Sequence, residues 1–243
     1  PRMLQAFDWN SLNQGANNSA ALDAFIDSLL AKTGAEKIAL MGHSAGGGVC
    51  YTYLSDPARA KKVAHYVHIA SSVQNGPAGP TGSPVPTLNL WSPADAIAQG
   101  GDIPGAANVK LEGKDHYQVA TSKESFAAIY KFFHGVDAPT LIAQPEAVVC
   151  IAGKTLTFGE NTPLKNAKVD IYELDPATGA RLTTAPFETW YSQPNGQWGP
   201  TNVKGATRYE FVVTPPAAGS RIIHYYREGF VHLNTLVYLR SIP

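Results

Sequence analysis

The apolar residues of the chain change their spacing near residue 140. Before that point, short continuous apolar runs such as KIALM (37–41) and PTLNLW (86–91) alternate with segments whose apolar residues recur at helical spacing. Beyond it, only short strand-like runs remain, separated by turns rich in Gly, Pro, Asn and Asp. Alternating strands and helices predict a parallel sheet with right-handed crossovers, whereas consecutive short strands predict a β-sandwich.

This change of spacing predicts two domains. We expect an α/β domain over residues 1–137, a linker over 138–146 and an all-β sandwich over 147–243, which suits a length of 243 residues. The 19 Lys and Arg residues balance the 19 Asp and Glu residues, so no basic face for nucleic acid is expected. No apolar run approaches the roughly 18 residues that a transmembrane helix needs.

The elements expected in each domain follow from the same spacing. In the first domain, helices are expected over 20–33, capped by Ser19 and ended by Gly34, then from Ala45, and after a capping box that begins at Thr121. Strands are expected there over 3–8, 37–41, 64–70, 86–91 and 108–112. In the second domain they are expected over 147–158, 167–174, 181–186, 187–192, 207–214, 220–228 and 233–240.

Residues 42–46, GHSAG, match the G-x-S-x-G pattern of a nucleophile elbow. The match follows an apolar strand and precedes a helix, which is the setting that this chemistry requires. A serine in such a turn projects its hydroxyl above the sheet edge, and the helix N-terminus directs N–H groups at an oxyanion. The pattern therefore predicts Ser44 as a nucleophile, against the alternative of a glycine-rich turn with an incidental serine.

A serine nucleophile needs a base and an orienting carboxylate, which this kind of fold places in the chain order Ser, acid, His. Asp95 and His116 follow the strands expected at 86–91 and 108–112, at the sheet edge where ligands of α/β proteins bind. Asp102 is the reserve acid. Asp115 adjoins His116 and is expected to be a solvated loop charge.

The other histidines are expected to play no part in the site. His43 precedes the serine and is expected to point away from it. His65 and His68 lie in an expected strand and are predicted to pack there, and the remaining histidines lie elsewhere: His134, His224 and His232.

The segments AEKIALMGHSAGGGVCYTYLSDPARAKKVAHYVHIAS, LNLWSPADAIA and VKLEGKDHYQVATSKESFAAIYKFF resemble the bacterial lipases and esterases of the α/β-hydrolase superfamily. The resemblance covers residues 1 to about 135. It implies hydrolysis of a carboxylic ester, with Ser44 as nucleophile, His116 as base and then acid, Asp95 orienting His116, and the backbone N–H of Ala45 as half of the oxyanion hole.

The first domain departs from that family at its N-terminal end. The family's other oxyanion donor comes from a loop after an earlier strand, commonly marked by a His-Gly pair, and no such pair precedes Ser44. We expect that about 50 residues, with the first strands and this second donor, are absent from the chain or supplied as a separate segment. Pro1, in place of Met, agrees with that expectation.

The second domain resembles prealbumin-like or carboxypeptidase-regulatory-like sandwich modules, through GKTLTFGENTPLKNAKVDIYELDPATGARL and NGQWGPTNVKGATRYEFVV. Such modules are typically accessory. Some lipases similar to this chain carry a C-terminal β-domain that holds lipid near the active site. The aromatic residues of this domain are expected to be mainly core residues.

The expected function is a lipase-like serine hydrolase that acts on a lipid or another ester and needs no metal or other cofactor. A polyester depolymerase with the same triad is one alternative, and a lipid- or surface-binding module with a vestigial hydrolase half is another. Charged residues make up only 16% of the chain, which together with its Gly, Pro and Asn content favours an extracellular protein. Cys50 and Cys150 are expected as thiols, and a bridge between them is left open.

Overall fold

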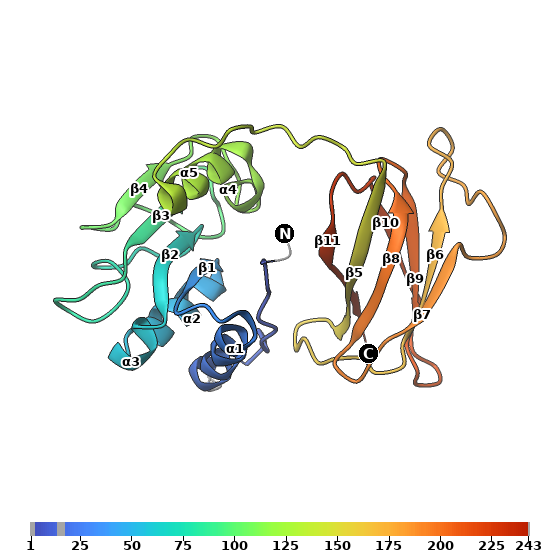
Figure 1. Cartoon of the computed structure of the whole chain (residues 1–243), viewed down its shortest axis with the longest axis horizontal. Coiled ribbons are helices and arrows are strands. Elements are labelled where there is room, and N and C mark those ends of the chain that lie inside the picture. Colours follow the sequence, from blue (N-terminus) through green and yellow to red (C-terminus); the bar gives the residue numbers. More distant parts are fainter. Residues whose placement is uncertain (1–2, 14–17, 243) are drawn as a thin grey trace. The chain divides into compact units, whose positions relative to one another are not determined.

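The structure is a computed structural model that describes residues 3–13 and 18–242. Its contacts divide the chain into two compact units (Figure 1). One unit is Gly15–Leu141, and the other joins Pro1–Gln14 to Ile142–Pro243. None of the helices that the structure describes is long and apolar enough to cross a membrane.

The first unit is built on a four-stranded parallel sheet. Its strands lie in the order β1-β2-β3-β4, with β1 at Ile38–His43, β2 at Val63–Ile69, β3 at Thr87–Trp91 and β4 at Ala107–Lys110. The helices are α1 at Asn18–Thr33, α2 at Ala45–Leu54, α3 at Pro57–Ala60, α4 at Gln118–Thr121 and α5 at Lys123–His134. This arrangement confirms the predicted α/β class with a parallel sheet.

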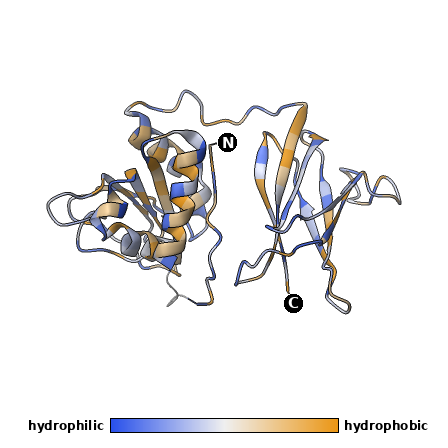
Figure 2. Cartoon of the chain, turned by 60° about the horizontal axis from the view of Figure 1, so that its bottom comes forward, coloured by the Kyte–Doolittle hydropathy of each residue, from blue (hydrophilic) through white to orange (hydrophobic). Residues whose placement is uncertain are grey.

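Helices α2 and α5 cover opposite faces of β2. Val67 and Ile69 belong to an apolar cluster that packs against the side chains of α5, whereas the hydroxyl of Tyr66 lies 3.2 Å from the carbonyl oxygen of Gly47 in α2. Successive side chains of a strand point to opposite faces, so the two helices must lie on different sides of the sheet. The apolar character of these strands is visible in Figure 2.

The segment 3–8, which was predicted as a strand, forms no strand, and that prediction is wrong. This N-terminal segment contacts the sandwich instead. Ser11 donates from its main-chain N–H to the carbonyl oxygen of Gly159 over 3.1 Å, and Asn161 donates to the carbonyl oxygen of Trp9 over 2.7 Å. Asp8, the last residue of the predicted strand, also forms an ion pair with Lys154 of the sandwich. For the same reason residues 1–14 group with the second unit and not with the predicted range 1–137.

The predicted helix boundaries are partly correct. Gly34 ends α1 with φ 70°, as predicted, but α1 already begins at Asn18, so Ser19 lies inside the helix and does not cap it. The cap of α5 is Ser122, whose hydroxyl accepts the main-chain N–H of Ser125, and not Thr121. Thr121 instead ends the short helix α4.

The second unit is a sandwich of two sheets, as predicted. Four strands pair antiparallel in the order β10-β9-β6-β7, and three more lie in the order β11-β5-β8, where β11 runs parallel to β5. Buried side chains such as Trp198, Phe211 and Leu239 form its core. The bounds are β5 at Val148–Thr157, β6 at Lys168–Glu173, β7 at Glu188–Tyr191, β8 at Gln197–Lys204, β9 at Tyr209–Thr214, β10 at Ile223–Arg227 and β11 at Asn234–Ser241.

Two strand predictions in the sandwich are wrong. Residues 181–186 form no strand beyond an isolated bridge between Leu174 and Arg181. The strand β8 was not predicted, because Gly199 and Pro200 interrupt its pattern and because proline cannot donate to a neighbouring strand. Trp198, Thr201 and Val203 of β8 are nevertheless buried, so tertiary packing determines its conformation.

Cys50 and Cys150 are both free thiols. Cys50 is buried in α2, and burial raises the pKa of its thiol to about 12. Such a thiol behaves as a small apolar side chain and is a poor nucleophile at neutral pH.

Candidate active site

Ser44 occupies the turn between β1, which ends at His43, and α2, which begins at Ala45. Its backbone has φ 54° and ψ −127°, a conformation that residues other than glycine rarely adopt. Its main-chain N–H donates to the carbonyl oxygen of Ile69 in β2 over 3.0 Å. The predicted strand-turn-helix setting is therefore present, and Ser44 lies at its most constrained position.

The glycines around Ser44 differ in what they make room for. A Cβ atom on Gly42 would lie 2.6 Å from the carbonyl oxygen of Gly46, and one on Gly47 would lie 2.4 Å from the hydroxyl oxygen of Ser71. A Cβ on Gly46 itself would meet nothing within 4 Å. Of the pattern's two glycines, only the first is therefore crowded, and the second has open space for a side chain.

Two buried polar side chains of β2 lie next to Gly47 and form a hydrogen-bonded network. Tyr66 and His68 are fully buried in β2, and the hydroxyl of Tyr66 lies 2.8 Å from Nδ1 of His68. His68 Nε2 lies 3.0 Å from the carbonyl oxygen of Ser72, which can only accept, so Nε2 carries the proton and Nδ1 accepts from Tyr66. Burial lowers the pKa of His68, which keeps the ring neutral. The prediction that His68 packs within its strand is confirmed.

Gly47→Ala should destabilise the chain by about 2 to 4 kcal/mol, because the new methyl group would overlap two atoms that cannot easily move. The Cβ would lie 2.7 Å from Cβ of Ser71 and 2.8 Å from Cε1 of His68, whose ring is held by hydrogen bonds on both nitrogens. Urea unfolding followed by circular dichroism would measure the change.

Gly48→Ala is the matched control for this substitution. Gly48 lies in the same helix, and a Cβ there would meet nothing within 4 Å. Because alanine favours a helix by about 1 kcal/mol over glycine, this variant should be as stable as the parent or more so. Equal unfolding midpoints for the two variants would contradict the close packing of Gly47.

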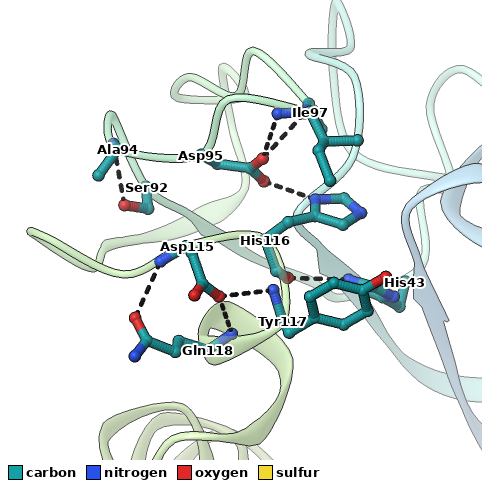
Figure 3. A network of polar contacts seen from close by, with 10 residues as sticks. His43, Ser92, Ala94, Asp95, Ile97, Asp115, His116, Tyr117 and Gln118 are labelled. Carbon is teal, nitrogen blue, oxygen red and sulfur yellow. Dashed lines mark hydrogen bonds and ion pairs between the residues drawn. The ribbon is translucent and has the colours of Figure 1, made fainter.

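Asp95 and His116 form a buried hydrogen-bonded pair (Figure 3). Nδ1 of His116 lies 2.8 Å from Oδ2 of Asp95, and the side chains are 7% and 1% exposed, respectively. An ionised carboxylate only accepts hydrogen bonds, so the proton lies on Nδ1 and the lone pair of the neutral ring lies on Nε2. The pair thus has the tautomer that a general base requires.

The loop after β3 keeps Asp95 ionised. Burial by itself would raise the pKa of Asp95, but the carboxylate accepts the main-chain N–H of Ala98 at 2.9 Å, the ring of His116, and the N–H of Ile97 at 2.8 Å. These bonds outweigh burial, and the pKa of Asp95 is lowered. The two main-chain donors were not anticipated from the sequence, although a turn centred on an aspartate is a common way to form them.

The competing acids have other partners. Oδ1 of Asp102, the reserve acid, accepts the indole N–H of Trp91 over 2.8 Å. Oδ1 of Asp115 accepts the main-chain N–H groups of Tyr117 and Gln118, at 2.9 and 2.8 Å, at the start of α4. Neither of these contacts involves the ring of His116.

The side chain of His43 does not point away from the site, and that prediction is wrong. Its Nε2 lies 3.1 Å from the carbonyl oxygen of His116, and the two ring centroids are 4.6 Å apart. His43 is the last residue of β1 and lies beside His116 in Figure 3. A histidine next to a serine gave no local signal for this contact, since the two residues are 73 positions apart.

The predicted site residues come from one edge of the sheet. Ser44, Asp95 and His116 follow β1, β3 and β4, and parallel strands end at the same edge. Ala45 is the first residue of α2, where main-chain N–H groups lack partners within the helix. The structure joins His116 to Asp95, while no hydrogen bond from Ser44 Oγ to His116 occurs among residues 3–13 and 18–242.

Two family models match the chain. Residues 8–98 match the model described as alpha/beta hydrolase fold, and residues 147–242 match the model described as Lipase C-terminal domain. The chain is therefore an α/β-hydrolase with a C-terminal β-sandwich domain. The two matches together support a lipase-like hydrolase, in agreement with the sequence resemblance.

Several solved structures show weak similarity to the chain. An (S)-allantoin synthase is 15% identical with a TM-score of 0.27, and the match covers 51% of this chain and 54% of that one. The C-terminal domain of the shaft pilin spaA of Lactobacillus rhamnosus GG is 15% identical with a TM-score of 0.27, over 38% and 98%. A catechol 1,2 dioxygenase of Acinetobacter radioresistens is 14% identical with a TM-score of 0.24, over 34% and 35%. These scores are too low to indicate a shared fold.

Proposed function

We propose that the chain is a serine carboxylic-ester hydrolase that cleaves acyl esters through an acyl-enzyme on Ser44. The observation that carries this proposal is the hydrogen-bonded pair of His116 and Asp95, at the sheet edge where Ser44 is held in a strained turn. Strained backbone and a buried carboxylate–imidazole pair have a known use together in nucleophilic catalysis.

The proposed reaction has two halves. In the first, Nε2 of His116 takes the proton from the hydroxyl of Ser44 while Oγ attacks the acyl carbon, and the negative charge that develops on the carbonyl oxygen faces the N–H of Ala45. Collapse of this intermediate breaks the ester bond, and His116 returns the proton to the departing alcohol. In the second half, His116 takes a proton from water, whose oxygen attacks the acyl carbon, and the acid leaves as Ser44 regains its proton.

Asp95 acts through His116 in this scheme. The imidazole becomes positively charged each time that it holds the proton, and the adjacent carboxylate stabilises this charge. The main-chain N–H groups of Ile97 and Ala98 keep the carboxylate ionised and fix its direction. The ring of His116 is thereby held in the tautomer that presents Nε2 to Ser44.

We propose that the second oxyanion donor lies on a segment that pairs with the free edge of β1. Within the described parts of the chain, β1 pairs only with β2, so its other edge has no partner strand there. An unpaired edge presents main-chain N–H and C=O groups, so it is suited to a further strand. Loss of one oxyanion donor typically lowers turnover about 10²- to 10³-fold. A kcat of residues 1–243 in the usual range of about 1–10³ s⁻¹ would contradict this proposal.

Labelling with a fluorophosphonate tests the proposed nucleophile. The reagent phosphonylates an activated serine, and peptide mass mapping of the labelled chain should find it on Ser44. Ser71 and Ser72 are internal controls, because they lie near the elbow without the predicted activation and should stay unlabelled. A well-folded chain that takes up no label would favour the binding-module alternative, in which the hydrolase half is vestigial.

A graded series of p-nitrophenyl esters would then measure substrate preference. Short acyl chains would indicate an esterase, and long chains a lipase, because each buried methylene contributes about 0.8 kcal/mol to binding. Release of soluble products from an aliphatic polyester film would instead indicate the depolymerase alternative.

A further inference from the structure

We propose that His43 is a positioning residue that ties the turn of Ser44 to the loop of His116 and so fixes the distance between nucleophile and base. The inference rests on the proposed ester hydrolysis, because it assigns a role within that same site. It assigns His43 no contact with the substrate.

The tie is a hydrogen bond between two parts of the site. His43 is bonded covalently to Ser44, and its Nε2 lies 3.1 Å from the carbonyl oxygen of His116. A carbonyl oxygen only accepts, so His43 donates its Nε2–H. The rings of His43 and His116 also pack at 4.6 Å between centroids with a tilt of 43°. One side chain therefore contacts both the backbone and the ring of the base.

His116 is held at two separate points. Asp95 holds the ring through Nδ1, and His43 holds the main chain through its carbonyl group. The hydrogen bonds described for Asp115, Tyr117 and Gln118 join residues of this loop and α4 to one another. They preserve the internal shape of the loop, but they do not fix its distance from β1. The bond from His43 does so.

The charge of His43 suits this position. Burial lowers the pKa of His43, and this effect outweighs the bond to the His116 carbonyl, which acts in the opposite direction. The titratable groups that face His43 are His116 and Tyr117 from the loop before α4, and Asp95 from the loop after β3. A neutral His43 leaves His116 free to gain its proton during catalysis, whereas a protonated His43 would repel it.

Two substitutions separate the hydrogen bond from the space that the side chain fills. His43→Gln retains an N–H donor at a similar distance along the side chain, and His43→Leu retains bulk without a donor. We expect His43→Leu to lower kcat about 10- to 100-fold with little change in KM, because misplaced reacting groups cost factors of this size. His43→Gln should recover most of the wild-type kcat.

The acid side of the pH profile gives an independent readout. Because burial lowers the pKa of His43, this residue gains its proton only on the acid side of the profile, and its positive charge should then lower kcat/KM in the wild type. His43→Gln has no ring to protonate, so this decrease should be missing from its profile. A purely structural role for His43 would leave the acid sides of the two profiles parallel.

A measurement without turnover separates this inference from the proposed function. The NMR resonance of the Nδ1 proton of His116 reports its bond to Asp95. It should be present in the wild type and in His43→Gln, and weakened or lost in His43→Leu. If this pattern appears in a chain that neither hydrolyses esters nor takes up fluorophosphonate, the positioning role stands and the proposed function fails. If His43→Leu keeps the wild-type kcat and resonance, or if His43→Gln is as impaired as His43→Leu, the positioning role is overturned.

Discussion

Ser44→Ala should lower kcat for ester hydrolysis by about 10⁵- to 10⁶-fold, because the covalent route disappears with the hydroxyl and only general stabilisation of the transition state remains. The fold should be unaffected, since the methyl group occupies the place of the serine Cβ in the same turn. Hydrolysis of a p-nitrophenyl ester would measure the loss, and circular dichroism would check that the variant is folded.

Ser72→Ala is the matched control for the nucleophile. Ser72 is an exposed serine that follows β2, and its main-chain carbonyl, which the substitution retains, accepts the bond from His68. This variant should keep wild-type turnover. Retention of more than about 1% of the wild-type kcat in purified Ser44→Ala would rule out Ser44 as the nucleophile, because the expected residual rate is far lower.

Asp95→Asn should lower kcat about 10³- to 10⁴-fold, with KM nearly unchanged. The amide of asparagine can donate to Nδ1 of His116, which would move the ring proton to Nε2 and remove the lone pair that Ser44 requires. The asparagine would also leave the positive charge of His116 without its carboxylate partner. Steady-state kinetics on the same ester would separate kcat from KM.

Asp102→Asn distinguishes the two candidate acids. Asp102 accepts a hydrogen bond from Trp91, and the carbonyl oxygen of asparagine can accept the same bond, so turnover should stay within about twofold of the wild type. If Asp102→Asn were the more damaging of the two substitutions, Asp95 would not be the orienting acid. The pair of variants therefore tests the assignment directly.

The residues expected in the site could be found in the sequence because each follows a recognisable strand. Ser44 lies in a local pattern, and Asp95 and His116 come directly after apolar runs whose carboxyl ends must meet in a parallel sheet. The contact of His116 with Asp95 follows from this topology, and the structure contains it at 2.8 Å. The class of fold was predictable for the same reason, because it depends on the order of strands and helices.

The contacts that could not be predicted depend on packing between distant segments. His43 was misjudged because alternation along β1 says nothing of a loop 73 residues away. Gly47 lies outside the G-x-S-x-G pattern. A glycine is needed there because a side chain would overlap His68 in β2 and Ser71 in the loop that follows β2. Strand β8 was missed because its glycine and proline are typical of turns, while burial of Trp198 overrides that local preference.

The backbone of Ser44 has a consequence for engineering the chain. A library screened only for resistance to heat would favour glycine at position 44, because glycine adopts a φ of 54° without steric cost, and every such clone would lack the proposed nucleophile. Position 48 lies in the first turn of α2, and it offers open space for a methyl group. Efforts to make the chain more robust should therefore randomise position 48 and hold position 44 constant.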